Sequence, residues 1–559
     1  MCRGRIDPDT HVLGQVRAVV LDEIHLLHGT ARGEMVRWLF ERLARFLCRP
    51  MGGGAAGGEA RPFQVVALSA TVRDPGAVMG VYCPAGTLVE VPGTRPIEVV
   101  GGPDTVRTED AILAYLGTLA RPEKILVFCN SRARVDQLAL EMRGPLEYAG
   151  CEVISHHGSL GKGIREAAET RLRRGTKVVA FATSTLELGI DIGDIDLVVL
   201  DGPPPDTASF LQRIGRGNRR TGTTRVMQCS ANRLEEVVAG AMVCAAQAGE
   251  LCAGPTGPQY AVSVQQMASY IFQSPLKRAR PRAKLVELIQ SRGDPCLAEG
   301  LLDHLVEIGH FEEGEDGVRL GESWLEKTET GGIHSVIEAA KGYTVVDAKS
   351  GETVATGVEY RGEGRLGVGG HGYDVSKVTG TSVEVQRTAG RDNGEQARYR
   401  SRRSMLGGSH PLLVRWHLGI PDEVWPVISS RGRDFAFHLG GFVGRTILNL
   451  VAKRAGADVQ VNDWYAELPE GKLCPPAWII DVSLAQLALH VDDRLESLEA
   501  GLGRPFANRW LPRELRRIEI ESWLSLDDEL SRIAGSQWTW DFDPAWKCEL
   551  AGVLECLAS

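Results

Sequence analysis

Two adjacent carboxylates, Asp22 and Glu23, directly follow the apolar run Val19-Val20-Leu21 and precede His25. Phosphoryl transfer needs charge neutralisation and an in-line nucleophile. A strand-end pair of this kind suits that chemistry, because one carboxylate can hold Mg²⁺ through water while the other polarises the attacking water. Standing alone, such a pair is more often a helix N-cap and its first turn than a catalytic pair. Its interpretation therefore depends on the motifs that follow.

Further polar motifs follow short apolar runs along the chain. They are Ser69-Ala70-Thr71, Asn130-Ser131-Arg132, His156-His157-Gly158, Thr183-Ser184-Thr185 and Gln212-Arg213-Ile214-Gly215-Arg216-Gly217-Asn218-Arg219. His157 and Gly158 fit a plain strand-end turn equally well. Polar motifs that repeat in this way predict a ligand site built from several loops.

The elements that position these motifs are predicted to be parallel strands. Each apolar run is β-branched, apolar on nearly every position and followed by an amphipathic stretch, which is typical of an α/β fold with strands buried on both faces. The predicted strands are 16–21, 64–68, 124–129, 152–155, 177–182 and 196–200. Because ligands bind at the carboxyl ends of parallel strands, we expect the motifs to gather there.

Length and composition limit the remaining possibilities. The 559 residues correspond to about three to five domains. The 43% apolar and 24% charged residues exclude wholesale disorder. The net charge of −9 argues against a polyanion binder that works by bulk charge. Any nucleic-acid contact must then come from a local patch, and Arg213, Arg216, Arg219, Arg220 and Arg225 are predicted to form a positive cluster of that kind.

The cysteines and the lack of a long apolar segment indicate the cellular compartment. The 12 cysteines include no Cys-x-x-Cys pair, which argues against a zinc ribbon or a disulfide framework and suits a reducing compartment. No apolar segment of about 18 residues occurs. We expect a cytoplasmic protein with no membrane partner.

The ordered motifs resemble those of superfamily 2 helicases, and specifically the large helicase-related (Lhr) family of DNA-stimulated ATPases. The match is specific between Asp22 and Arg219; beyond it, Ile333-His334-Ser335 is similar to the motif that opens the family's barrel. The resemblance implies an α/β protein whose RecA-like motor domains, the first one incomplete, precede a winged helix, a small β-barrel and a mostly helical domain. The implied ranges are 1–100, 101–250, 255–332, 333–423 and 424–559.

The resemblance also implies roles for individual residues, with ATP and Mg²⁺ as cofactors. Asp22 would hold Mg²⁺ through water, Glu23 would act on the attacking water and Gln212 would orient the arginine loop. Arg216 and Arg219 would reach the γ-phosphate. Gly189 and Asp191 would lie near the ribose, and His25, Ser69 and Thr71 would couple hydrolysis to movement. Arg132, Thr183 and His157 would contact nucleic acid.

The chain departs from the family in one motif. A motor of this class needs a Gly-Lys-Ser/Thr loop, whereas the Gly-Lys pairs here, at 161–162 and 471–472, lack the hydroxyl residue. We expect either a fragment of a longer helicase or a truncated relative, and little ATP hydrolysis by this chain alone.

The implied function is an ATP-dependent helicase or translocase acting on single-stranded or tailed DNA, in a repair context. A non-catalytic nucleic-acid-binding relative and an RNA helicase are the alternatives. The C-terminal tryptophans fit a protein core better than base stacking. The oligomeric state does not follow from the sequence.

Overall fold

The computed structural model describes most of the chain, in segments separated by short gaps. The described residues are 11–47, 62–69, 72, 74–90, 96–101, 107–187, 192–217, 222–251, 257–274, 279–290, 295–330, 332–335, 342–362, 364–388, 395–399, 409–469, 484–502 and 510–558. Their strands form five sheets. In this part of the chain, no helix is long and apolar enough to cross a membrane.

A six-stranded parallel sheet forms the largest α/β unit, with the strand order β3-β8-β7-β4-β6-β5. Its strands are β3 (Ile97–Val99), β4 (Lys124–Cys129), β5 (Glu152–His156), β6 (Val178–Ala182), β7 (Leu197–Asp201) and β8 (Thr224–Cys229). Its helices are α3 (Thr108–Thr118), α4 (Arg132–Tyr148), α5 (Lys162–Arg174), α6 (Thr207–Ile214) and α7 (Arg233–Ala248). The four strands predicted from residue 124 onwards are confirmed to within one residue. β3 joins this sheet by pairing with β8, although the sequence assigned its residues to the first unit.

The first α/β unit has a two-stranded parallel sheet of β1 and β2. Its elements are η1 (Val12–Gln15), β1 (Ala18–Leu21), η2 (Ile24–Leu26), α1 (Ala31–Leu47), β2 (Gln64–Ala67) and α2 (Pro75–Tyr82). A small core lies around Phe40 and Tyr82. Val20, in the middle of β1, is 60% exposed. This sheet therefore exposes an apolar side chain on one face.

A helical unit follows and packs on α1. It contains α8 (Tyr260–Phe272), α9 (Arg282–Gln290), α10 (Pro295–Glu307), the hairpin β9 (Phe311–Gly314) and β10 (Gly317–Leu320), η5 (Glu322–Trp324), α11 (Leu325–Thr330) and η6 (Gly332–His334). The predicted hairpin is confirmed. Trp38 of α1 lies in the core of this unit, and Arg42 of α1 donates to Gln266 and Ser269 of α8. The first α/β unit and the helical unit thus share one core.

The next unit is a closed β-barrel. Its strands are β11 (Tyr343–Asp347), β12 (Thr353–Glu359), β13 (Arg365–Val368), β14 (His371–Val378), β15 (Ser382–Arg387), β16 (Glu395–Gln396) and β17 (Arg398–Tyr399). β16 pairs with β13 at one edge of the sheet and β17 pairs with β12 at the other. Because only Ala397 separates β16 from β17, the segment 395–399 joins the two edges and closes the barrel. Ile333 and His334, expected at the start of this unit, instead contact α8 through Gln265 and Ser269.

The C-terminal unit combines helices with a five-stranded sheet, which the sequence did not predict. Its helices are α12 (Ser409–Leu418), α13 (Gly441–Ala455), α15 (Leu484–Asp493), α16 (Leu495–Gly501), α17 (Arg513–Leu524), α18 (Leu526–Ala534) and α19 (Pro544–Ala558), and its strands are β18 (Val424–Ser430), β19 (Arg433–Ala436), β20 (Gln460–Val461), β21 (Ala466–Pro469) and β22 (Gln537–Thr539). Trp464, Trp510 and Trp523 are buried, so the prediction that C-terminal tryptophans are core residues is confirmed for these three.

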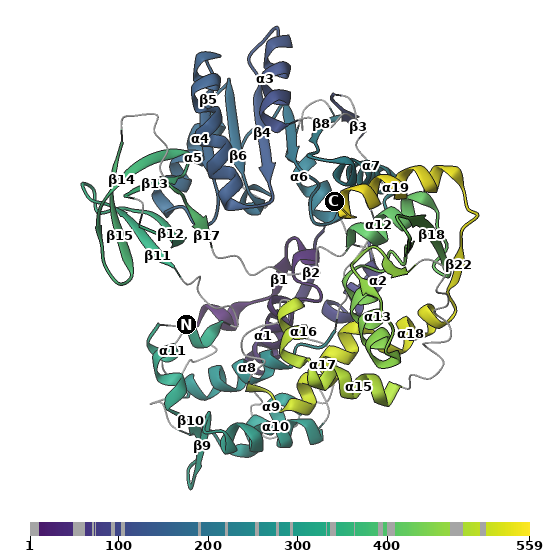
Figure 1. The fold of residues 1–559 in the computed structure, drawn as a ribbon. Helices are drawn as coiled ribbons and strands as arrows, with labels where there is room; N and C mark the ends of the chain where they lie inside the picture. Colours follow the sequence, from purple (N-terminus) through teal and green to yellow (C-terminus); the bar gives the residue numbers. More distant parts are fainter. Residues whose placement is uncertain are drawn as a thin grey trace.

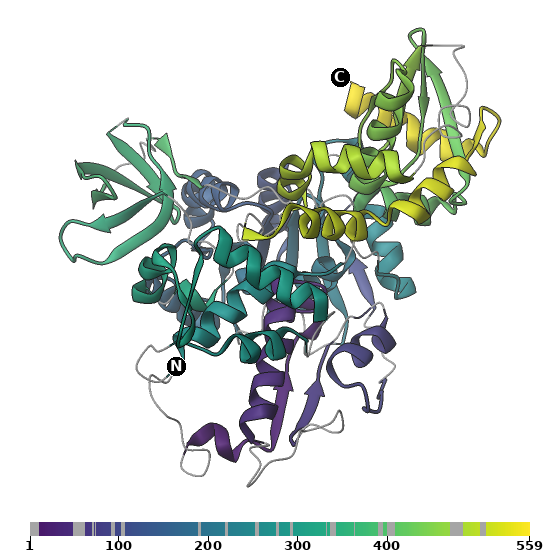
Figure 2. The ribbon, with the colours of Figure 1, turned by 90° about the horizontal axis from the view of Figure 1, so that it is seen from below.

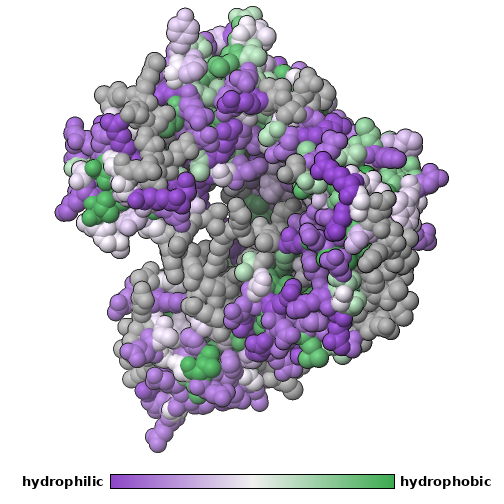
Figure 3. Space-filling model, viewed as in Figure 1, coloured by the Kyte–Doolittle hydropathy of each residue, from purple (hydrophilic) through white to green (hydrophobic). Residues whose placement is uncertain are grey.

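The units surround the large parallel sheet. Figure 1 shows the barrel beside α4 and α5 on one side of this sheet and the C-terminal unit beside α7 on the other, and the view from below keeps them on opposite sides (Figure 2). The helical unit lies at the bottom of Figure 1. On the face drawn in Figure 3, hydrophilic side chains dominate and apolar ones are scattered.

Candidate active and nucleic-acid site

The acidic motif lies in a tight turn at the end of β1. Asp22 is exposed, and its Oδ1 accepts the backbone N–H of Glu23 at 3.0 Å. Glu23 has a φ of 51°, in the left-handed region that side chains other than glycine rarely adopt. Such strained residues concentrate at functional sites. The turn brings the Glu23 carboxylate to 3.5 Å from Nδ1 of His25.

His25 joins the two α/β units. Its Nδ1 lies 2.7 Å from Oγ of Ser69, which follows β2, and its Nε2 contacts the side-chain amide of Gln212 on α6 of the other unit. Burial lowers the pKa of His25 against the opposing effect of Glu23, so the imidazole is neutral near pH 7. Four residues that the sequence singled out, Glu23, His25, Ser69 and Gln212, therefore meet at one place.

The arginine motif begins on α6. Asp206 caps this helix by accepting the N–H of Ser209 at 2.7 Å. Arg213 then donates from Nε to Oε1 of Glu187 at 2.6 Å and from Nη1 to Oδ1 of Asn130 at 2.8 Å. Its guanidinium also lies over the ring of Phe128. Arg213 thus fastens α6 to the loops that follow β4 and β6.

The predicted positive cluster is wrong for the arginines that the structure describes. Arg213 is buried against Glu187, and Arg216 is buried and donates to the backbone carbonyl of Glu187. Arg225 lies 3.4 Å from Glu98 and 3.6 Å from Glu123. The local sequence does not show these partners, because the acids come from distant segments. Arg220 lies outside the described residues.

Two of the three predicted nucleic-acid residues follow neighbouring strands. Arg132 begins α4 directly after β4, donates to Oγ of Ser159 at 2.8 Å and lies over the ring of Tyr399. Thr183 follows β6 and is half-buried. β4 and β6 are adjacent and parallel, so both residues lie at the same edge of the sheet. Their hydroxyl and guanidinium groups suit backbone phosphates.

His157 lies in a buried junction between the large α/β unit and the barrel. Its side chain is 0% exposed, its Nε2 lies 3.2 Å from Oδ1 of Asp136, and its ring meets Tyr399 edge to face. Asp136 also accepts the hydroxyl of Tyr399 at 2.7 Å and the N–H of Gly369 at 2.7 Å. In this arrangement His157 offers no surface to a nucleic acid. The role of Asp136 was not predicted from the sequence, because a single acidic residue within an amphipathic helix resembles a solvated surface residue.

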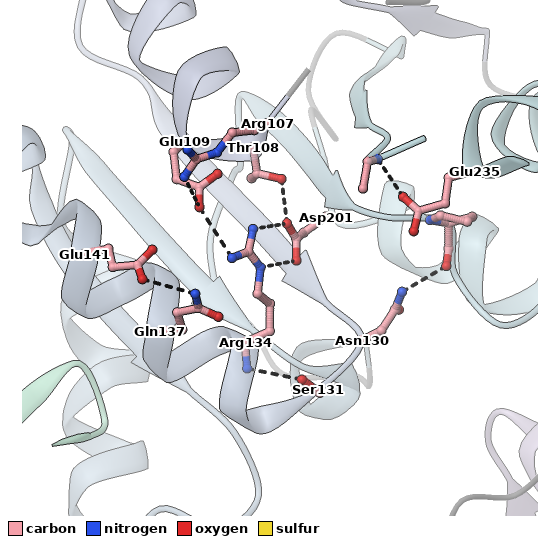
Figure 4. Close-up of polar contacts among 12 residues, drawn as sticks. Arg107, Thr108, Glu109, Asn130, Ser131, Arg134, Gln137, Glu141, Asp201 and Glu235 are labelled. Atoms are coloured by element: carbon pink, nitrogen blue, oxygen red, sulfur yellow. Dashed lines mark hydrogen bonds and ion pairs between the residues drawn. The ribbon is translucent and has the colours of Figure 1, made fainter. Parts of the chain in front are cut away.

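A second network that the sequence did not reveal holds the end of β7. Figure 4 shows the guanidinium of Arg134 directed at the carboxylate of Asp201, with Nε–Oδ2 and Nη2–Oδ1 distances of 3.0 Å each. Thr108 donates to the same carboxylate at 2.5 Å, and Glu109 lies 3.4 Å from Nη1 of Arg134. This bidentate geometry fixes the point from which the chain leaves β7 for α6.

Four of the predicted site residues lie outside the described residues: Thr71, Gly189, Asp191 and Arg219. Within the described part, no cluster of three or more His, Cys, Asp or Glu side chains forms a metal site. The exposed carboxylate of Asp22 is nevertheless a hard oxygen donor of the kind Mg²⁺ takes when it keeps its waters and binds substrate phosphates. The residues present fit Mg²⁺ that arrives with a nucleotide.

Residues 108–221 match the helicase conserved C-terminal domain family. ATP-dependent helicase Lhr-Core of Methanothermobacter thermautotrophicus is 31% identical over 226 residues, which are 37% of this chain and 25% of that protein. Helicase Lhr of Mycobacterium smegmatis, solved with ssDNA and AMP-PNP, superposes with a TM-score of 0.57 at 18% identity over 99% of this chain and 78% of that one, so the two chains share a fold. In sequence, 37% of this chain is similar to an Lhr helicase.

Other known proteins are similar to this chain in sequence over part of its length or in fold over most of it. Lhr helicase/probable uracil glycosylase of Mycolicibacterium smegmatis is 29% identical over 253 residues, 38% of this chain and 16% of that protein. The DUF1998 helicase MrfA, solved with DNA, has a TM-score of 0.51 at 15% identity over 87% of this chain and 71% of that one. The sequence of this chain thus aligns with a quarter or less of the length of these two curated relatives.

Proposed function

We propose that this chain is the nucleic-acid-tracking part of an ATP-dependent helicase or translocase of the Lhr type that acts on single-stranded or tailed DNA. The observation that carries the proposal is the position of His25, which contacts Ser69 in one α/β unit and Gln212 in the other. A single imidazole then contacts both the acidic motif and the helix that carries the arginine motif. Such a contact suits a motor in which hydrolysis and movement between units are coupled.

The proposed chemistry is distributed over the two units. When bound, ATP with Mg²⁺ would supply the phosphoryl group for transfer to water. Asp22 would hold the ion through water, and Glu23 would orient and polarise the attacking water. Gln212 would position the arginine helix, while Arg216 and Arg219 would stabilise charge on the phosphoryl oxygens. Gly189 and Asp191 would bind near the ribose, and Ser69 and Thr71 would relay the state of the site together with His25.

Nucleic acid is proposed to run along the carboxyl edge of β4 and β6, where Arg132 and Thr183 lie. Contacts there go to phosphate oxygens, so they position the strand without reading its sequence. The relatives solved with ssDNA and with DNA support DNA as the substrate. We propose a cytoplasmic location, since the 12 cysteines include no Cys-x-x-Cys pair and suit a reducing compartment.

The experiment that tests the proposal measures binding and hydrolysis separately. We expect the purified protein to bind a fluorescent single-stranded DNA of about 30 nucleotides with an affinity that falls steeply as salt rises. We expect little phosphate release from ATP, because the 559 residues contain no Gly-Lys-Ser/Thr loop. Absence of DNA binding at low salt would refute the proposal. Robust DNA-stimulated hydrolysis that Arg216→Ala abolishes would instead show that other residues hold the phosphates.

RNA as the substrate is the second candidate, because Arg132 and Thr183 suit phosphates of either polymer. Competition between DNA and RNA oligonucleotides of equal length and sequence separates the two. Preferential displacement of the labelled DNA by RNA would assign the chain to RNA.

A further inference from the structure

The loop that connects β7 to α6 is built almost entirely from proline, as Pro203-Pro204-Pro205. Proline fixes φ and has no backbone N–H, so three in succession form a stiff segment that makes no hydrogen bonds of its own. Its carbonyl groups still need donors where they are shielded from water. The direction in which α6 starts therefore depends on groups outside the loop.

Each of the three proline carbonyls accepts a hydrogen bond from a different side chain. Asn130, from the loop after β4, donates to the Pro203 carbonyl at 2.9 Å. His410 donates from Nε2 to the Pro204 carbonyl at 2.7 Å, and Ser409 donates its hydroxyl to the Pro205 carbonyl at 2.7 Å. Burial lowers the pKa of His410, so its ring is neutral near pH 7 and holds the N–H that this bond uses.

The two ends of the proline loop are fixed as well. At the start, the Arg134 fork holds Asp201, and Gly202 turns the chain with a φ of 78°. At the end, Asp206 caps α6. Asn130 also accepts from Arg213 of α6, so the same side chain contacts the loop and the helix that the loop introduces. The remaining support comes from Ser409 and His410, which belong to a different unit.

We propose that Ser409 and His410 are positioning residues through which the C-terminal unit sets α6, and with it Gln212 and Arg216. The inference rests on the proposed function of those two residues. α12, which begins with Ser409 and His410, packs in the same core as Phe435 and Phe437 of the C-terminal sheet region. A displacement of the C-terminal unit therefore moves the supports of the proline loop and changes where the arginine helix begins.

Hydrogen–deuterium exchange of the intact protein tests this positioning role. In His410→Ala, we expect amides of residues 206–217 to exchange about fivefold faster, the effect of losing one hydrogen bond of about 1 kcal/mol. Ser409→Ala should act in the same direction. His410→Gln should restore slow exchange, because its side-chain amide can donate to the Pro204 carbonyl without titrating. His417→Ala, an exposed histidine on the same helix, is the matched control and should change nothing.

Two outcomes would overturn the inference. If His410→Ala accelerates exchange in α12 and α19 while α6 stays protected, the contact only docks the C-terminal unit. If His410→Gln fails to restore protection of α6, the donated hydrogen bond is not what sets the helix. Affinity for single-stranded DNA should stay unchanged in all three variants, because Ser409 and His410 bond to Pro205 and Pro204, whereas Arg132 begins α4 and Thr183 follows β6. Failure of the unmodified protein to bind DNA would refute the proposed function while leaving the exchange result intact.

Discussion

Arg213 and Glu187 form an ion pair, 2.6 Å between Nε and Oε1, in which the side chains are only 4% and 7% exposed. Burial raises the pKa of Glu187, and Arg213 opposes that rise. The pair is therefore a fixed link between α6 and the loop after β6.

Arg213→Gln should destabilise the protein by about 3–5 kcal/mol, because it leaves the Glu187 carboxylate buried without its cation. A carboxyl with a raised pKa binds its proton more tightly in the folded state, so its contribution to stability falls as pH rises above its ordinary pKa. The loss in free energy of unfolding caused by Arg213→Gln, measured by urea unfolding, should therefore be smaller at pH 5 than at pH 7.5. Arg171→Gln, which breaks an exposed pair with Glu152, should cost less than about 1 kcal/mol. A deficit independent of pH would contradict the assignment.

Arg132→Ala should weaken binding of single-stranded DNA by about tenfold and lower the slope of log affinity against log salt by about 0.7, the value for one phosphate contact. Fluorescence anisotropy at several salt concentrations measures both. Arg121→Ala is the control: its side chain is 73% exposed and it precedes β4, at the opposite edge of the sheet. Equal losses in the two variants would mean that Arg132 contributes only overall charge.

Tyr399→Phe should destabilise the junction between barrel and sheet by about 1.5–3 kcal/mol, the range for hydrogen bonds to charged groups. The variant removes the hydroxyl that donates to Asp136 and nothing else. Hydrogen exchange over residues 365–373 should accelerate before the rest of the protein unfolds. Tyr148→Phe, a side chain that is 97% exposed, should have no effect. Unchanged protection of 365–373 would show that Asp136 does not fasten the barrel.

His438 should make stability fall in acid. Its side chain is fully buried, accepts the N–H of Gly440 and donates to the Asn462 carbonyl, and burial lowers its pKa to about 3. The unfolded state therefore binds more protons between about pH 3 and 6.5, and stability falls by about 1.4 kcal/mol per pH unit as pH drops through that window.

Urea unfolding at pH 5, 6 and 7, followed by tryptophan fluorescence, measures this slope. His438→Asn should be less stable overall, and its free energy of unfolding should change with pH by about 1.4 kcal/mol per pH unit less than that of the unmodified protein. The exposed His417→Asn should keep the slope of the unmodified protein. Parallel pH curves for His438→Asn and the unmodified protein would contradict the prediction.

The large α/β unit was predictable from sequence because its strands are buried on both faces. β4 occupies the predicted residues, 124–129, since each side of it must be apolar. The barrel's closure was not predictable, because β16 and β17 are two residues each and carry no periodic signal. Strand β20 of the C-terminal sheet was not predicted for the same reason, because it is also two residues long.

The site was predictable where a motif carries its own chemistry. The meeting of His25, Ser69 and Gln212 follows the order implied by the resemblance to Lhr helicases. The acidic partners of Arg213 and Arg225 were not predicted. Glu187, Glu98 and Glu123 are distant from these arginines in the sequence and lie beside them only in the folded chain. A cluster of arginines in sequence therefore overstated the positive charge that the surface presents.

The C-terminal unit shares its apolar residues with both halves of the protein. Phe435 and Tyr465 lie in the core of the large α/β unit, whereas Trp510 and Leu515 lie in the core that α1 and the helical unit share. Close-packed cores resist deformation, so the two α/β units cannot move apart without changing the packing of the C-terminal unit, which contributes side chains to both cores.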